Sequence, residues 1–138
     1  MMRRASPLLL LAMLSGCAST FYSATKGAST KSPDDTFTCI QDQLGKLGYK
    51  RKNYDSGERW FVAQKTDPTA RLADVRFRQR VDRLDIRVRP DANGNSSVEM
   101  KAQSFNQFDN QQGLSEDEIS ASNQVKQDAQ TVMGACGQ

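Results

Sequence analysis

The stretch that decides the fold is RLDIRVRPDANGNSSVEMKAQS, residues 83–104. Apolar residues alternate with charged or polar ones in both of its halves: Leu84, Ile86 and Val88 in the first, then Val98, Met100 and Ala102 in the second. Such alternation is typical of β-strands with one buried face. The Asn93-Gly94 pair between the two halves indicates a hairpin.

The length of the connecting loop decides which side chains share a face. A two-residue turn at Asn93-Gly94 would set Val88 opposite Glu99, and the two apolar sets would lie on opposite faces of the sheet. A three-residue loop, residues 92–94, puts both sets on one face and leaves Gly94 where such loops need a left-handed residue. We therefore predict the three-residue loop, with the cross-strand pairs Val88–Val98, Ile86–Met100, Leu84–Ala102, Arg87–Glu99 and Asp85–Lys101.

Two more strands are predicted before this hairpin, over residues 49–54 and 58–66, with Trp60 and Val62 on one face and Phe61 and Ala63 on the other. Residues 71–81 do not keep the phase of the strand that follows them. We expect them to form a separate or edge segment; the alternative is a bulge near residues 81–83 that restores the phase.

An amphipathic helix is predicted at each end of this β-rich region. Ser32-Pro33-Asp34-Asp35 supplies a cap, a proline and first-turn acids, and an apolar stripe follows: Phe37, Ile40, Leu44 and Leu47, with Gly48 at the end. The last helix is expected to begin at the capping box Ser115-Glu116-Asp117-Glu118. Its inner face would comprise Ile119, Ser122, Val125, Ala129, Val132, Met133 and Cys136.

These elements predict a single α+β domain over residues 33–138. We expect an antiparallel sheet of about four to five strands, with the N- and C-terminal helices packed on one of its faces.

The amino terminus carries an export signal. Arg3-Arg4 precedes an apolar run that ends in Leu14-Ser15-Gly16-Cys17. This order resembles the signal peptide and lipobox of the bacterial lipoprotein class. The resemblance implies cleavage after residue 16, a diacylglyceryl group on the Cys17 sulfur and an acyl chain, such as palmitate, on the new amino terminus. An ordinary cleaved signal that contains a cysteine is the alternative.

The same resemblance implies a location in the cell envelope. Ala18, rather than an aspartate, follows the cysteine, which in the class pattern favours the periplasmic face of the outer membrane over the inner one. Residues 17–32 are small, polar and aperiodic, and we expect a lipidated flexible tether that spans roughly 20–25 Å.

Cys39 and Cys136 are the other two cysteines, and each falls in a predicted helix. In an exported protein such a pair is expected to form a disulfide. Closing a loop of roughly 100 residues contributes on the order of 4–5 kcal/mol. The chain has no histidine, which disfavours the alternative of a metal site on these two thiols; we expect no metal and no cofactor.

Arginine is the most conspicuous candidate for ligand binding. Arg76, Arg78 and Arg80 would share one face of an extended segment, with no acid between them on that side. Guanidinium groups in such a row suit an anionic envelope component. The alternative is a solvated charged face that protects a strand from mispairing.

Nothing in the sequence indicates catalysis. Histidine is absent, as are the Gly-x-Ser-x-Gly elbow and a glycine-rich phosphate loop. We therefore expect a non-enzymatic binding or structural protein, attached to the membrane by its lipid and bound to another envelope protein or an anionic component. Removal of Arg3 and Arg4 leaves 17 basic against 16 acidic residues, so no nucleic-acid partner is expected. The alternative is a small-ligand-binding or hydrolytic domain with a cleft near Trp60.

Overall fold

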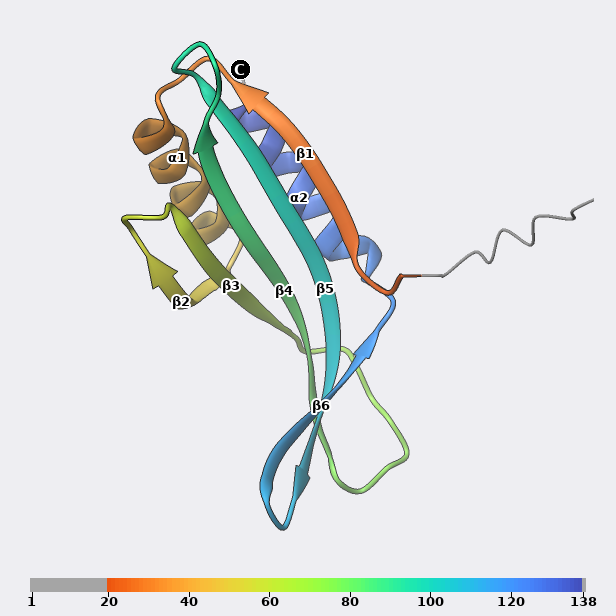
Figure 1. Ribbon diagram of the computed structural model, residues 1–138. Helices are drawn as coiled ribbons and strands as arrows, with labels where there is room; N and C mark the ends of the chain where they lie inside the picture. Colours follow the sequence, from red (N-terminus) through yellow and green to blue (C-terminus); the bar gives the residue numbers. More distant parts are fainter. Residues whose placement is uncertain (1–19, 138) are drawn as a thin grey trace, which may run out of the picture.

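The computed structural model describes residues 20–137, which form six strands and two helices (Figure 1). In chain order these are β1 (Ser23–Ser29), α1 (Pro33–Lys46), β2 (Lys50–Asp55), β3 (Trp60–Asp67), β4 (Phe77–Pro90), β5 (Ser96–Asn110), β6 (Gly113–Ile119) and α2 (Asn123–Cys136). The predicted signal peptide, residues 1–16, and the predicted lipidation site Cys17 lie outside the described residues.

All six strands form one antiparallel sheet in the order β1-β5-β4-β3-β2, and β6 pairs with β5. β5 has 15 residues and is long enough to pair with two strands along the edge that faces away from β4. β1 pairs with residues 96–102 and β6 with residues 104–110. The predicted α+β fold with an antiparallel sheet is confirmed. The sheet has six strands, however, and not four to five.

The hairpin of β4 and β5 has the register of a three-residue loop, as predicted. Val88 pairs with Val98 and Arg87 with Glu99. The backbone N–H of Asp91 donates to the carbonyl of Asn95 at 2.8 Å, and Gly94 has φ +77°. The left-handed residue is therefore a glycine at the position where the loop requires one.

The prediction of a separate segment over residues 71–81 is wrong for its second half. β4 begins at Phe77 and continues through Pro90, and its one register shift lies between Phe77 and Gln79. The alternative, a bulge near residues 81–83, is not found either: the pairing with β5 is continuous there, and the consecutive residues Val81 and Asp82 are both buried, on opposite faces. Alternation of burial is lost where both faces of a strand are covered.

The predicted flexible tether is also wrong over residues 23–29, which form β1. Its alternate residues are half-buried or buried, from Ser23 to Ser29. Without β1 the first half of β5 would present unpaired backbone groups, and pairing satisfies them. Gly27 leaves room for the Met133 side chain of α2, which a Cβ at this position would overlap.

The last helix begins seven residues later than predicted, with its cap at Ser122 and not at Ser115. Residues 113–119 form β6, and α2 starts after Ser122, whose hydroxyl accepts a hydrogen bond from the N–H of Val125 at 3.1 Å. The capping box at residues 115–118 therefore lies in a strand. The first helix has the predicted cap: Ser32 Oγ accepts from the N–H of Asp35 at 3.2 Å, and Gly48 follows its end with φ +90°.

One core joins both helices to the sheet. α1 contributes Phe37, Ile40 and Leu44, α2 contributes Val125, Ala129 and Val132, and the two central strands contribute Leu84, Ile86, Val88, Val98, Met100 and Ala102. These strand residues share one face, so that both helices pack against the same side of the sheet (Figure 1). We call the opposite side the open face.

A buried polar cluster fixes the start of α2. Asp82 is 5% exposed and accepts hydrogen bonds from the hydroxyls of Ser104 (2.5 Å) and Ser122 (2.9 Å). The N–H of Ser122 donates in turn to Ser104 Oγ at 2.9 Å. The capping residue of α2 is thus bonded to two strands. Nearby, burial and a 2.9 Å hydrogen bond to Asp128 raise the pKa of the Tyr49 hydroxyl.

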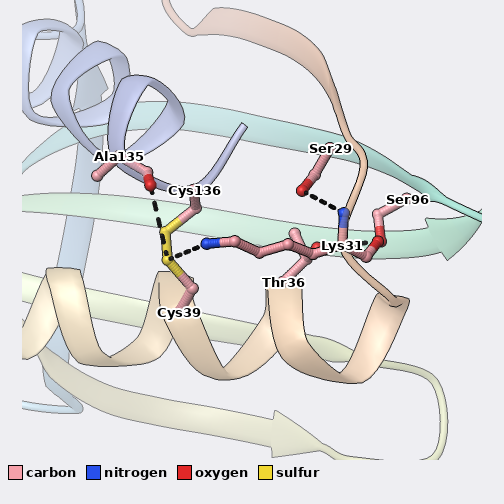
Figure 2. Close-up of a disulfide and its surroundings, with 7 residues drawn as sticks. All are labelled: Ser29, Lys31, Thr36, Cys39, Ser96, Ala135 and Cys136. Carbon is pink, nitrogen blue, oxygen red and sulfur yellow. Dashed lines mark hydrogen bonds between the residues drawn. A yellow bond between two sulfur atoms is a disulfide. The ribbon is translucent and has the colours of Figure 1, made fainter. Parts of the chain in front are cut away.

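The end of α2 is tied to α1 by the Cys39–Cys136 disulfide (Figure 2). The S–S distance of 2.07 Å is that of a bonded pair, as the sequence predicts. Polar contacts surround it: Thr36 donates to Ser96 Oγ at 3.1 Å, and Ser96 donates to the carbonyl of Lys31 at 2.9 Å. Three parts of the chain therefore meet at this end of the domain: α1, β5 and the segment that follows β1.

Replacement of both cysteines should destabilise the domain by about 4–5 kcal/mol, because the unfolded chain regains the freedom that the disulfide removes. The comparison is Cys39→Ser/Cys136→Ser against the parent, both carrying Cys17→Ser, in urea unfolding at pH 7. Reduced parent protein should unfold at the same urea concentration as the double variant. An unchanged midpoint in the presence of reductant would contradict the stabilising role.

Candidate functional site

The open face carries a hollow of about 580 Å³ between β2 on one side and β6 on the other. Most of its lining residues are polar, and the exceptions are Val62 and Leu114; the polar ones are Lys52, Asn53, Gln64, Arg83, Asp85, Gln103, Gln107 and Glu116. The register places these side chains together, because Gln64 and Gln103 both lie opposite Arg83 and Gln107 lies opposite Glu116.

Arg83 is the centre of a hydrogen-bond network across this hollow. Its guanidinium donates to Glu116 Oε2 at 2.7 Å and to Gln64 Oε1 at 2.8 Å. Gln107 also donates to Glu116, at 2.8 Å, and accepts from Gln79 at 2.7 Å. The network therefore links four strands, β3, β4, β5 and β6, through side chains alone.

The contacts in this network lower the pKa of its carboxyl group, Glu116. Burial alone would raise the pKa of Glu116, but the hydrogen bonds from Arg83 and Gln107, together with the charge of Arg83, lower it below its ordinary value of 4.5. The Arg83 guanidinium also lies over the ring of Phe105, 4.4 Å from its centroid. Arg83 and Glu116 thus form an ion pair among the side chains that line the hollow.

A basic rim borders the hollow along β2. Lys50 and Lys52 line a second cavity of about 560 Å³, which shares Lys52 and Gln64 with the first. All six residues of β2 are exposed, and no strand of the described part of the chain pairs with its outer edge. Among residues 20–137, the ion pairs include neither Lys50 nor Lys52. This rim is a place where an anionic group can contact the protein.

The three predicted arginines do not form a row without acids. Arg76 lies in the loop before β4 and pairs with Asp74 at 2.8 Å, which holds the pKa of Asp74 below its usual value. Arg78 lies 3.5 Å from Asp109, and Arg80 donates to Asn106 at 2.8 Å. Arg76 and Arg78 therefore have carboxylate partners and Arg80 an amide partner, and anion binding by these three arginines stays a prediction.

Trp60 lies on the open face with Val62, and Phe61 and Ala63 lie on the other, as predicted. The indole Nε1–H of Trp60 donates to Asp85 Oδ1 at 2.7 Å. Asp85 lines the hollow, whereas Trp60 is not among its lining residues. The tryptophan thus supports the edge of the hollow by orienting a carboxylate.

The glutamines of the open face were missed by the sequence analysis. Single glutamines carry no motif, and their role depends on which residues lie opposite them. The available signal is the predicted register, which already sets Arg83 opposite Gln103; placing Gln64 there also requires the pairing of β3 with β4.

Two further properties concern membranes and metals. Within the described residues, neither helix is long and apolar enough to cross a membrane. No group of three or more potential metal-ligating side chains occurs in residues 20–137. Comparison of the chain with known protein families finds no match, and neither does comparison with curated proteins.

The pKa of Glu116 should rise toward 4.5 in an Arg83→Gln variant. A carboxyl whose pKa is lowered by folding stabilises the protein above its unfolded pKa, and this contribution is lost as the pH falls through the lower, folded value. Parent protein should therefore lose this part of its stability below about pH 4.5, and Glu116→Gln should not. NMR titration of the side-chain carboxyl carbon measures the pKa; an equal value with and without Arg83 would contradict the network.

Proposed function

We propose that this protein is a non-enzymatic lipoprotein of the bacterial cell envelope, anchored on the periplasmic face of the outer membrane, and that its open face binds another envelope component. The anchor is supported by the lipobox ending at Cys17. A cysteine pair within disulfide distance, Cys39 and Cys136, is consistent with an oxidising compartment.

The observation that carries the binding proposal is the hollow of the open face. Its charged and amide side chains are bonded to one another, as the network around Arg83 illustrates. A surface of this kind is preorganised to exchange hydrogen bonds with a polar ligand, because little side-chain freedom is lost on binding. The neighbouring rim of Lys50 and Lys52 favours a ligand that carries phosphate or carboxylate groups.

The open-face site replaces the arginine row as our first candidate for the anion contact. Arg76 and Arg78 already have carboxylate partners, so a ligand would have to compete with them. A ligand that binds Lys50 and Lys52 would not have to displace a carboxylate, because neither lysine is in an ion pair within the described residues. A hydrolytic site at Trp60 is less well supported, because Asp85, the carboxylate nearest the indole, is held by its hydrogen bond.

The anchor is tested by Cys17→Ser in the full chain. We expect the parent to float with membranes in a sucrose gradient and the variant to be found in the soluble periplasmic fraction, because more than one acyl chain is needed for stable attachment. Mass spectrometry of the parent should give the mass of a chain that starts at residue 17 and carries the lipid. A full-length, unmodified chain would refute the anchor.

The binding surface is tested with a photo-cross-linking amino acid at Gln103, in the hollow, and at Asp42, on the exposed side of α1. In intact cells we expect an adduct from position 103 and none from position 42. Lys50→Glu/Lys52→Glu should reduce the adduct about fivefold or more, as expected for loss of charge complementarity. Lys46→Glu, on an exposed helix position, is the matched control. Equal adducts from both positions, or no effect of the charge reversal, would contradict the proposed surface.

A further inference from the structure

The domain is tied to its amino-terminal chain much closer to Cys17 than the sequence suggests. The carbonyl of Phe21 accepts a hydrogen bond from the N–H of Ala121 at 2.9 Å, just before α2. β1 begins two residues later, at Ser23, and pairs with β5. The chain is therefore part of the folded domain from residue 21 onward.

This attachment point limits how far the domain can stand from the membrane. Only three residues lie between Cys17 and Phe21, and a fully extended chain over these four residue steps spans roughly 14 Å. The polar headgroup layer is itself about 5–8 Å deep on each side of a bilayer. A lipid on Cys17 would therefore hold Phe21 at or just above the headgroups.

The side chains at this point suit a membrane surface. Phe21 is 53% exposed and Tyr22 39% exposed, although large apolar side chains are usually buried. The ammonium of Lys101 lies over the Tyr22 ring, 4.4 Å from its centroid. Aromatic rings with a lysine beside them are enriched where protein meets the headgroup layer, since the rings enter it and the cation attracts anionic lipid.

We propose that Phe21, Tyr22 and Lys101 form the surface through which the domain contacts the bilayer; this rests on the lipid anchor proposed above. The occupant of this aromatic patch is the lipid surface, because the short chain to Cys17 brings that surface within reach. The domain is then oriented, with the start of β1 toward the membrane.

The orientation is tested by tryptophan fluorescence in the lipidated chain, in a Trp60→Phe background that removes its only tryptophan. Phe21→Trp places the probe in the patch. Val75→Trp is the matched control, because Val75 is 98% exposed and precedes β4, which begins opposite the far half of β5. The vesicles contain phosphatidylethanolamine and phosphatidylglycerol with brominated acyl chains.

We expect the emission of the Phe21→Trp variant to shift to the blue and to fall by about half, and the emission of the Val75→Trp variant to stay unchanged. Tyr22→Trp should behave like Phe21→Trp, which guards against a local defect of one variant. If the protein floats with the vesicles but the Phe21→Trp variant is unquenched, or the Val75→Trp variant is the quenched one, the contact surface is refuted and the anchor stands. If the lipidated protein does not float, both proposals fail.

Discussion

The turn between β4 and β5 has three loop residues, 92–94, inside the hydrogen-bonded pair of Asp91 and Asn95, and their number determines which side chains of both strands share a face. With this register the apolar residues of both strands lie under the two helices, and Arg83, Gln103 and their neighbours lie together on the open face. A loop shorter by one residue would turn one of the strands over. The core and the candidate site therefore depend on the same backbone connection.

α2 is held at both of its ends by different chemistry. At its start, Ser122 is bonded to Asp82 and Ser104, which come from β4 and β5. At its end, Cys136 is joined to α1. Between these points the helix offers small and branched side chains to the sheet, and Gly27 gives it room beside β1. A helix fixed in this way can cover the core without long apolar side chains.

The elements predicted from the sequence are those with strong local patterns, whereas the missed ones depend on distant partners. The strand alternation around Leu84 and Val98 and the helix cap at Ser32 can each be recognised from a few neighbouring residues. β1 consists of small and polar residues, and it is a strand because β5 offers it an edge. The capping box at residues 115–118 is a valid helix signal. These residues nevertheless form β6, because they pair with residues 104–110 of β5. The hollow was missed for a similar reason, since its glutamines acquire a role only through the neighbours that pairing gives them.

The attachment of the amino-terminal chain through β1 also has a mechanical consequence. If the open face is held and a force is applied at residue 21, the force acts along β1. This strand pairs with β5 at seven positions. Strands loaded in this direction slide past each other, and their backbone hydrogen bonds must break together. A force applied at this end of the chain therefore loads the β1–β5 hydrogen bonds in shear before it reaches the core.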